Sequence, residues 1–184
     1  MIMKNLYLVF FGIVSLTIFS CKNNSKESKL EDATVENIAS ETKTYEIAKA
    51  EAEFNDPKVE AIFEVYLQVE AALVNTDASK TAAESAKLEA LLKEVNASGV
   101  TQSVVSVMAS SDDINVQREN FEDLSNGIET ILKGALKSGT LYKQYCPMAF
   151  NNKGAYWISS SEEILNPYFG DKMLKCGRVD SEVK

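Results

Sequence analysis

Four sulfur-bearing side chains fall in two short clusters near the C-terminal end of this 184-residue sequence. Cys146 and Met148 lie in "YCPM", and Met173 and Cys176 lie in "MLKC". Thiolate and thioether sulfurs are soft donors, which favour Cu(I), and Ag(I) by the same argument, over hard cations that prefer oxygen. The two clusters therefore predict a metal site whose ligands are Cys146, Met148, Met173 and Cys176.

Two other interpretations of the clusters remain open. Zinc is a weaker candidate than Cu(I), because zinc usually takes four Cys or His ligands and the sequence has no histidine. Cys146 and Cys176 can instead form a disulfide, worth about 3–4 kcal/mol in the chain-entropy account. A disulfide and a metal site exclude each other, since the metal needs thiolates. Met148 and Met173, taken alone, are more often core residues than ligands.

The sequence offers no set of residues suited to enzymatic catalysis. Histidine is absent, no nucleophile stands beside a base, and no glycine-rich phosphate loop occurs. The acidic pairs Asp112–Asp113 and Glu162–Glu163 are typical of helix starts, where the helix dipole favours negative charge. We therefore expect a protein that is not an enzyme. A hydrolase with paired carboxylates is a remote alternative.

The sequence around the sulfur clusters resembles two known groups of proteins. "YCPM" and "MLKCG" are similar to the heavy-metal-binding module of metal-efflux proteins, which opens on Tyr-x-Cys-Pro-Met-His and closes on Cys-Pro-x-Cys-Gly. The stretch from Leu141 to Gly177 is similar to a family of domains of unknown function. These occur as free-standing envelope lipoproteins and at the C-terminal end of periplasmic adaptor subunits of heavy-metal efflux pumps. With the preceding segments "VYLQVEAALVNTD" and "QRENFEDLS", the resemblance covers roughly Pro57 to Val179.

The resemblance implies a helical bundle with a metal-related role. Matched position by position, it supports Cys146, Met148 and Cys176 as site residues, and it places Met173 where the module has its first closing cysteine. Ala149 stands at the position of the module's histidine. Any site in this chain therefore lacks the nitrogen ligand and one thiolate of the module.

The N-terminus is typical of a bacterial lipoprotein precursor. Residues 1–20 combine a positive start at Lys4 with an apolar run from Leu6 to Phe19, as in a signal peptide. The run is short for a membrane span. "IFSC" resembles the site where such precursors are cleaved, which makes Cys21 the predicted lipidation site. An uncleaved anchor and a plain secreted protein are the alternatives.

The balance of charge limits the partners of the mature chain. Acidic residues outnumber basic ones by 27 to 19 in the whole sequence. Nucleic acid is therefore an unsuitable partner, because phosphate backbones require neutralising Lys and Arg. We expect contact with a membrane through lipidated Cys21 alone, in the cell envelope and facing the periplasm.

The hydrophobic pattern predicts a mainly α fold: a small up-and-down bundle of three to four helices with an irregular, partly β-hairpin C-terminal segment. Residues 21–55 read as a lipidated N-terminus and polar tether, partly helical near "EIAKAEAEF". Residues 56–184 form the predicted single domain. Asp56 and Asp77 are the expected N-caps of the first two helices. "VTQSVVSVMASS" suits either a strand or a helix, and we interpret it as a helix. A longer helix follows Asp113 and ends before Ser138.

The C-terminal segment, residues 141–179, has a different pattern. "NNKG" reads as a hairpin turn in which Gly154 takes a positive φ, and "KMLKC" reads as an edge strand. The segment is rich in aromatic residues, which favour core packing over a binding platform for a sugar or peptide. Of the adjacent Tyr156 and Trp157, we expect one to pack against the bundle, because neighbours in a strand face opposite sides.

Taken together, these features predict a non-enzymatic envelope lipoprotein that binds a soft metal ion, Cu(I), in copper or heavy-metal homeostasis or efflux. The resemblance implies a heavy-metal efflux adaptor or another periplasmic metal carrier as the partner. The alternative is a structural or protein-interaction module stapled by a Cys146–Cys176 disulfide.

Overall fold

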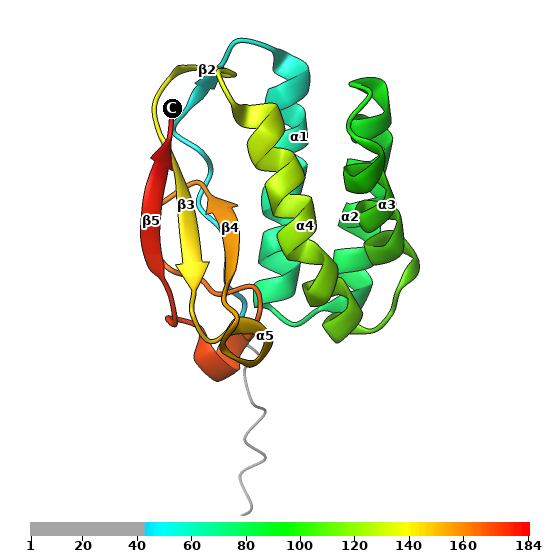
Figure 1. The fold of residues 1–184 in the computed structure, drawn as a ribbon, viewed down its shortest axis with the longest axis vertical. Coiled ribbons are helices and arrows are strands. Elements are labelled where there is room, and N and C mark those ends of the chain that lie inside the picture. Colours follow the sequence, from blue (N-terminus) through cyan, green and yellow to red (C-terminus); the bar gives the residue numbers. More distant parts are fainter. Residues whose placement is uncertain (1–42) are drawn as a thin grey trace, which may run out of the picture. The chain divides into compact units, whose positions relative to one another are not determined.

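The computed structural model describes residues 43–184, in which four long helices pack beside a small three-stranded sheet. The predicted signal peptide, Cys21 and the tether as far as residue 42 lie outside the described residues. The helices are α1 (Pro57–Val74), α2 (Ala78–Glu94), α3 (Gly99–Ser110) and α4 (Ile114–Leu132). In Figure 1, α1 and α4 lie next to the sheet and α2 and α3 lie on the far side of them. The predicted mainly α class with a partly β C-terminal segment is confirmed.

Each long helix begins at a residue whose side chain caps it. Asp56, Asp77, Ser98 and Asp113 accept a hydrogen bond from a backbone N–H in the first turn of α1, α2, α3 and α4 respectively. Such caps satisfy donors that have no partner within the helix. The two caps predicted from the sequence, Asp56 and Asp77, are therefore confirmed.

The segment that suits either a strand or a helix forms α3. Its buried residues Thr101, Val105 and Met108 recur at helical spacing. Gly127 of α4 allows a close approach to α3, because a Cβ at this position would lie 2.3 Å from the Thr101 Oγ1 atom. Tertiary packing thus overrides the strand preference of β-branched residues in this segment.

The fourth long helix is shorter than the sequence predicted. It ends at Leu132, whereas we expected it to continue to just before Ser138. Gly134 takes a positive φ of 71°, and the N–H of Ala135 donates to the Leu132 carbonyl. The chain turns there into β2 (Leu136–Ser138), which pairs with β1 (Glu53–Phe54). The glycine turn and this pairing together end the helix early.

Residues 43–54 run along the domain in an extended conformation. The side chain of Asn75, at the end of α1, accepts from the Tyr45 N–H and donates to the Tyr45 carbonyl, both at 2.8 Å. The hydroxyl of Ser160 donates to the carbonyl of Ala48. The expected helical stretch in this segment is therefore wrong, because side chains of the domain bind its backbone in an extended form.

The three-stranded sheet has the order β4-β3-β5, with all neighbours antiparallel. Its strands are β3 (Leu141–Cys146), β4 (Ala155–Ser159) and β5 (Arg178–Val183). The short helix α5 (Ala149–Asn152) connects β3 to β4, and Gly154 has a φ of 82°. The predicted hairpin and the predicted backbone of Gly154 are confirmed.

The predicted edge strand "KMLKC" is wrong. Residues Gly170–Met173 form a 3-10 helix, η1, and the strand begins only at Arg178. The backbone of Asn166 explains the difference: its N–H donates to the Leu174 carbonyl and its carbonyl accepts from the Gly170 N–H. The segment forms its backbone hydrogen bonds within a compact loop instead of within a sheet.

The core joins the helices to the sheet. Its largest fully buried side chains include Trp157, Tyr66, Phe63 and Phe121. Trp157 faces this core while its neighbour Tyr156 stays partly exposed, as predicted for adjacent residues of a strand. Packing against the bundle is thus the role of Trp157.

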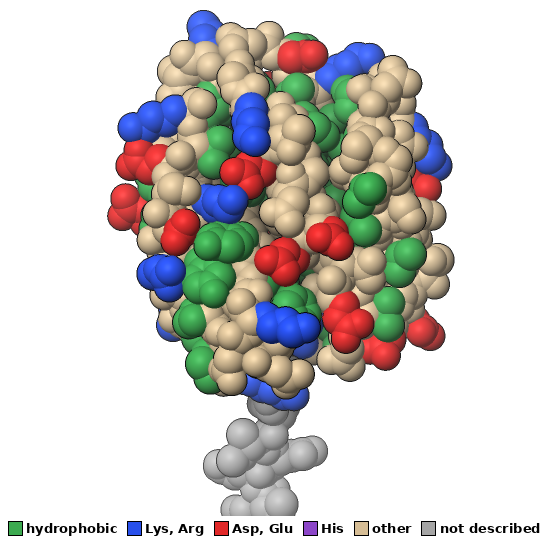
Figure 2. Space-filling view, viewed as in Figure 1, with side chains coloured by type: hydrophobic (Ala, Val, Ile, Leu, Met, Phe, Trp, Pro, Cys, Tyr) green, Lys and Arg blue, Asp and Glu red, His purple; other side chains and the backbone are tan. Residues whose placement is uncertain are grey.

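The outer face of the sheet carries a pair of aromatic rings between two cations. The ring centroids of Tyr145 and Tyr156 lie 4.5 Å apart. The Arg178 guanidinium lies over the Tyr145 ring, and the Lys143 ammonium lies over the Tyr156 ring. Figure 2 shows apolar side chains gathered over these strands, with charged side chains around them.

None of the helices within residues 43–184 has both the length and the apolar character that crossing a membrane requires.

Candidate metal centre at the end of the sheet

Cys146 is the last residue of β3, and its side chain faces the core. Burial along β3 places Gln144 and Cys146 inside, while Tyr145 between them is partly exposed. Cys146 is fully buried and pairs across the sheet with the small residue Ala155. The thiol of Cys146 therefore lies in the apolar interior, at the end of the sheet that precedes α5.

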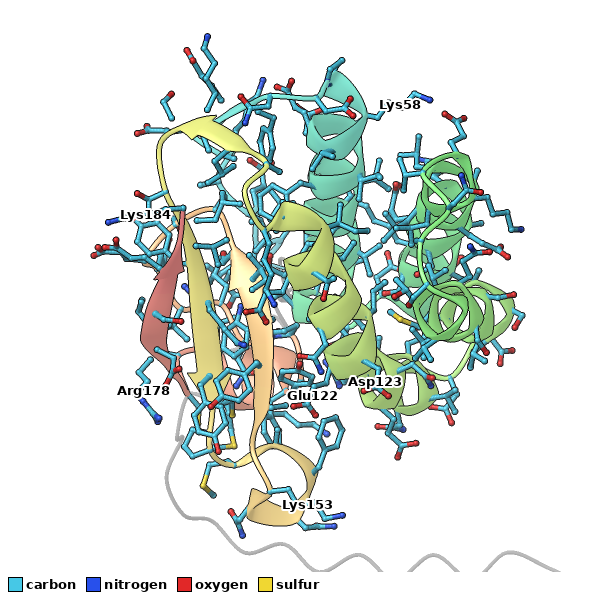
Figure 3. All side chains as sticks on the ribbon, turned by 45° about the horizontal axis from the view of Figure 1, so that its top comes forward. Lys58, Glu122, Asp123, Lys153, Arg178 and Lys184 are labelled. Atoms are coloured by element: carbon cyan, nitrogen blue, oxygen red, sulfur yellow. The ribbon has the colours of Figure 1, made fainter. Side chains whose placement is uncertain are left out.

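Cys176 lies in the loop just before β5, and its thiol meets that of Cys146. The two Sγ atoms are 3.6 Å apart, and both cysteines are free. Tyr145 pairs with Arg178 at this end of the sheet, so the chain just before β5 runs beside the end of β3. In Figure 3, sulfur atoms gather at this end of the sheet, next to the turn that carries Lys153.

Asn166 holds the loop that carries Cys176. Its side chain is fully buried and donates to the Cys176 carbonyl at 2.7 Å, while its Oδ1 atom accepts from the Tyr168 N–H at 2.9 Å. Sequence reasoning did not assign this role to Asn166. The signal was the Asn-Pro step, because asparagine often hydrogen-bonds to the backbone of a turn.

The distance between the thiols suits two ligands of one ion. Two thiolates bound at about 2.3 Å in tetrahedral directions lie about 3.8 Å apart. The observed 3.6 Å is close to this value. It exceeds the roughly 2.05 Å of a disulfide bond, so a disulfide requires the two sulfurs to approach each other. The two sulfurs are thus in van der Waals contact, and a small movement suffices either for a shared ion or for a disulfide.

Burial and the neighbouring Cys146 raise the pKa of the Cys176 thiol. Cys176 is therefore protonated at neutral pH, and an ion that binds there must displace its proton.

The two methionines line one cavity of about 440 Å³ next to the turn, and neither cysteine lines it. Met148 is 44% exposed, whereas Met173 of η1 is partly buried. The structure thus brings the cysteines together and places the methionines on one cavity. Within residues 43–184, no group of three or more Cys, His, Asp or Glu side chains is arranged to hold a metal.

The turn after Met148 has an unusual backbone. Phe150, Asn151 and Asn152 all have positive φ values, of 49°, 57° and 66°. This conformation costs L-residues about 1–2 kcal/mol each, and asparagine tolerates it best. A hydrogen bond from the Gly154 N–H to the Ala149 carbonyl closes the turn. The sequence indicated the turn, and its two adjacent asparagines were the signal for the left-handed backbone that we did not predict.

Glu70 is a buried carboxyl group that sequence reasoning missed. It is fully buried in α1, and neither of its carboxyl oxygens has a hydrogen-bond partner within residues 43–184. Desolvation raises the pKa of Glu70 well above its usual range, against the smaller opposing effect of the nearby Ser159 and Trp157 side chains. The signal was its spacing, because Glu70 follows Tyr66 by four residues and thus shares the buried face of α1.

Comparison with known proteins bears on the helical part of the chain. Residues 62–139 match the model of a family described as "Protein of unknown function (DUF3347)". The match spans most of α1, then α2, α3, α4 and β2, and it ends before Cys146. It confirms that this chain contains a domain of unknown function. No curated protein and no solved structure matches the chain.

Proposed function

We propose that this protein is a non-enzymatic lipoprotein of the cell envelope that binds one soft metal ion, Cu(I), between Cys146 and Cys176. The observation that carries the proposal is the 3.6 Å separation of the two Sγ atoms, both in free thiols. Two thiolates at this distance can hold one ion without rearrangement of the strands. Thiolate ligands favour Cu(I) over cations that prefer oxygen or nitrogen.

The surroundings of the thiol pair suit Cu(I). Cys146 is fully buried, so an ion reaches the pair from the side of Cys176. The Trp157 ring lies against Gly177, where an added Cβ would be 3.0 Å from it, and thus shields the backbone next to Cys176 from water. Exclusion of water and the absence of histidine favour retention of the ion as Cu(I).

Met148 and Met173 are the proposed additional donors, and their thioether side chains must turn from the cavity that they line toward the thiol pair to bind the ion. Both lie within two or three residues of a cysteine in the sequence and line the same cavity. The exposed side chain of Met148 makes it the first sulfur that an arriving ion meets. Flexible thioether side chains adapt readily to such a role.

The lipoprotein and its partner are proposed from the sequence. The apolar run that ends in "IFSC" supports lipidation of Cys21 and attachment to a membrane. The resemblance to domains of periplasmic efflux adaptors supports a heavy-metal efflux adaptor or another metal carrier as the partner. In this setting the protein holds copper on its way out of the envelope.

The same two cysteines support a second function of a different class. Because β3 and β5 are neighbours, a Cys146–Cys176 disulfide would pin the last strand to the domain. The protein would then be a structural or interaction module. Its docking surface would be the outer face of the sheet, where Tyr145 and Tyr156 lie between Lys143 and Arg178.

Native mass spectrometry of the chain from Lys22 to Lys184 distinguishes the two functions. The chain is purified without reductant, then reduced and offered Cu(I) together with a competing chelator. The metal function predicts one retained copper, which is lost in Cys176→Ser and in Cys146→Ser. Met148→Leu and Met173→Leu should weaken retention without abolishing it.

One outcome of the same experiment would contradict the metal function. A native mass lighter by two hydrogens, with no copper retained after reduction, would replace the metal function with the disulfide module. As a matched control, Met108→Leu alters a methionine buried in α3, away from the sheet, and should retain copper as the unmodified chain does.

A further inference from the structure

A second feature of the structure is the cavity of about 440 Å³ that the two methionines line. It is bounded by the first half of α4, by the left-handed turn and by the segment that leads into η1. We refer to it as the Arg118 cavity. Besides the methionines, its lining includes Asn115, Arg118, Glu119, Phe150, Asn151 and Tyr168.

Arg118 is the unusual member of this lining, because it is 9% exposed and yet carries a charge. Its Nε atom donates to the Pro167 carbonyl at 2.9 Å. Its Nη2 atom donates to the Leu73 carbonyl and to Thr76 Oγ1, both at 3.0 Å. All three acceptors are neutral. Arg118 therefore caps the C-terminal end of α1, where the helix dipole offsets part of its charge.

The positive charge of Arg118 is not balanced by any negatively charged side chain of the described residues. Among residues 43–184, no carboxylate lies within salt-bridge distance of the Arg118 guanidinium. Its Nη1 atom donates to no group of those residues. Burial lowers the pKa of Arg118, since no anion stabilises its charged form. Buried charges in proteins are normally paired, so this one lacks a partner.

The other walls of the cavity suit an apolar group. The rings of Phe150 and Tyr168 meet edge to face with centroids 5.5 Å apart. Met148 and Met173 add thioether side chains, which pack favourably on aromatic rings. Glu119 brings a negative charge to the lining and opposes a ligand with more than one negative charge.

We propose that the Arg118 cavity binds a small organic monocarboxylate with an apolar body. The carboxylate accepts hydrogen bonds from the free Nη1 of Arg118, and the body packs between the aromatic rings and the methionines. A carboxylate provides the missing counter-charge, and hydrogen bonds between charged groups are the strong ones. This inference stands on Arg118 and needs neither Cys146 nor Cys176, although Met148 and Met173 belong to both proposed sites.

NMR titration of the nitrogen-15-labelled chain from Lys22 to Lys184 with benzoate tests the proposal, and benzamide serves as the uncharged analogue. Benzoate is expected to shift backbone amides of the left-handed turn and of the first half of α4, and benzamide is not. Arg118→Gln should weaken benzoate binding by about tenfold or more, the loss expected for a charged hydrogen bond.

Glu119→Gln keeps the proposal testable if Arg118→Gln fails to fold. It removes the opposing charge, and it should tighten benzoate binding several-fold. Glu84→Gln, on α2 beside a separate cavity, is the matched control and should leave binding unchanged. Equal shifts with benzoate and benzamide, no shift with either, or unchanged affinity in Glu119→Gln would each overturn the proposal.

Discussion

The phenol oxygen of Tyr66 lies 3.1 Å from the backbone nitrogen of Ile158 and accepts its hydrogen bond. The same oxygen lies 2.7 Å from the Ser125 Oγ atom. One buried side chain of α1 thus connects α4 to strand β4, which carries the core tryptophan Trp157.

We expect Tyr66→Phe to lower the free energy of unfolding by about 1–3 kcal/mol, the usual cost of leaving a buried donor without a partner. The Ile158 N–H would lose its acceptor, whereas Ser125 keeps a bond to the Phe121 carbonyl. Urea unfolding measures the change. Tyr156→Phe is the control, since no described hydrogen bond uses its hydroxyl, and a loss of similar size there would contradict the role of Tyr66.

Glu70→Gln should stabilise the protein at neutral pH. Burial raises the pKa of Glu70 in the folded state, so the folded protein must keep a proton that the unfolded chain releases above about pH 4.3. This cost is absent at lower pH and grows by at most about 1.4 kcal/mol per pH unit until the pH passes the folded pKa. The stability gain of the variant should therefore vanish near pH 4.

Thermal unfolding at a series of pH values measures this gain. Glu60→Gln, in the first turn of the same helix, is the matched control and should show no such pH dependence. If the gain for Glu70→Gln is equal at pH 4 and pH 7, then folding does not raise the pKa of Glu70, and the carboxyl group is ionised at neutral pH in the folded protein.

Copper retention should increase with pH through neutrality. The raised pKa of Cys176 means that its proton is still bound at neutral pH and must leave when Cu(I) binds. Below the thiol pKa, affinity rises about tenfold per pH unit for each proton displaced. Competition with a chelator of known proton affinity, at about pH 6.5 and about pH 7.5, measures the slope. A flat response would mean that copper does not bind the Cys176 thiolate.

Gly170→Ala should destabilise the protein and disturb the Arg118 cavity. Gly170 has a φ of 57°, and an added Cβ would lie 2.6 Å from Thr76 Oγ1 and 3.1 Å from the Arg118 guanidinium. We expect a loss of about 1–3 kcal/mol, the range for a strained backbone position. Gly99→Ala is the matched control, because nothing lies within 4 Å of its added Cβ, and helix propensity there favours alanine. Equal stability of the two variants would contradict this packing.

The helical half of the fold was predictable because its signals are local. Asp56 and Asp77 cap the first two helices, as the sequence indicated. The end of α4 and the extended course of residues 43–54 were predicted wrongly, because both depend on partners far along the chain. Leu136 pairs with Phe54, and Asn75 binds the backbone of Tyr45.

The candidate site was predictable only in part, for a similar reason. The spacing of "YCPM" and "MLKC" indicated that Cys146 and Cys176 belong together, and their sulfurs do meet. The sequence could not show that Asn166 holds the loop of Cys176, nor that Arg118 lies buried at the end of α1. These roles arise from contacts across 10 and 45 positions, which no periodicity encodes.

The outer strand β5 affects the tendency of the protein to aggregate. Its edge away from β3 pairs with no strand of residues 43–184, and such an edge can recruit a strand from another molecule. A charged side chain stands at every second position: Arg178, Asp180, Glu182 and Lys184. They form ion pairs along the chain, Arg178 with Asp180 and Lys184 with Glu182. The strand is thereby protected against edge-to-edge aggregation, a hazard that grows with the local concentration of the protein.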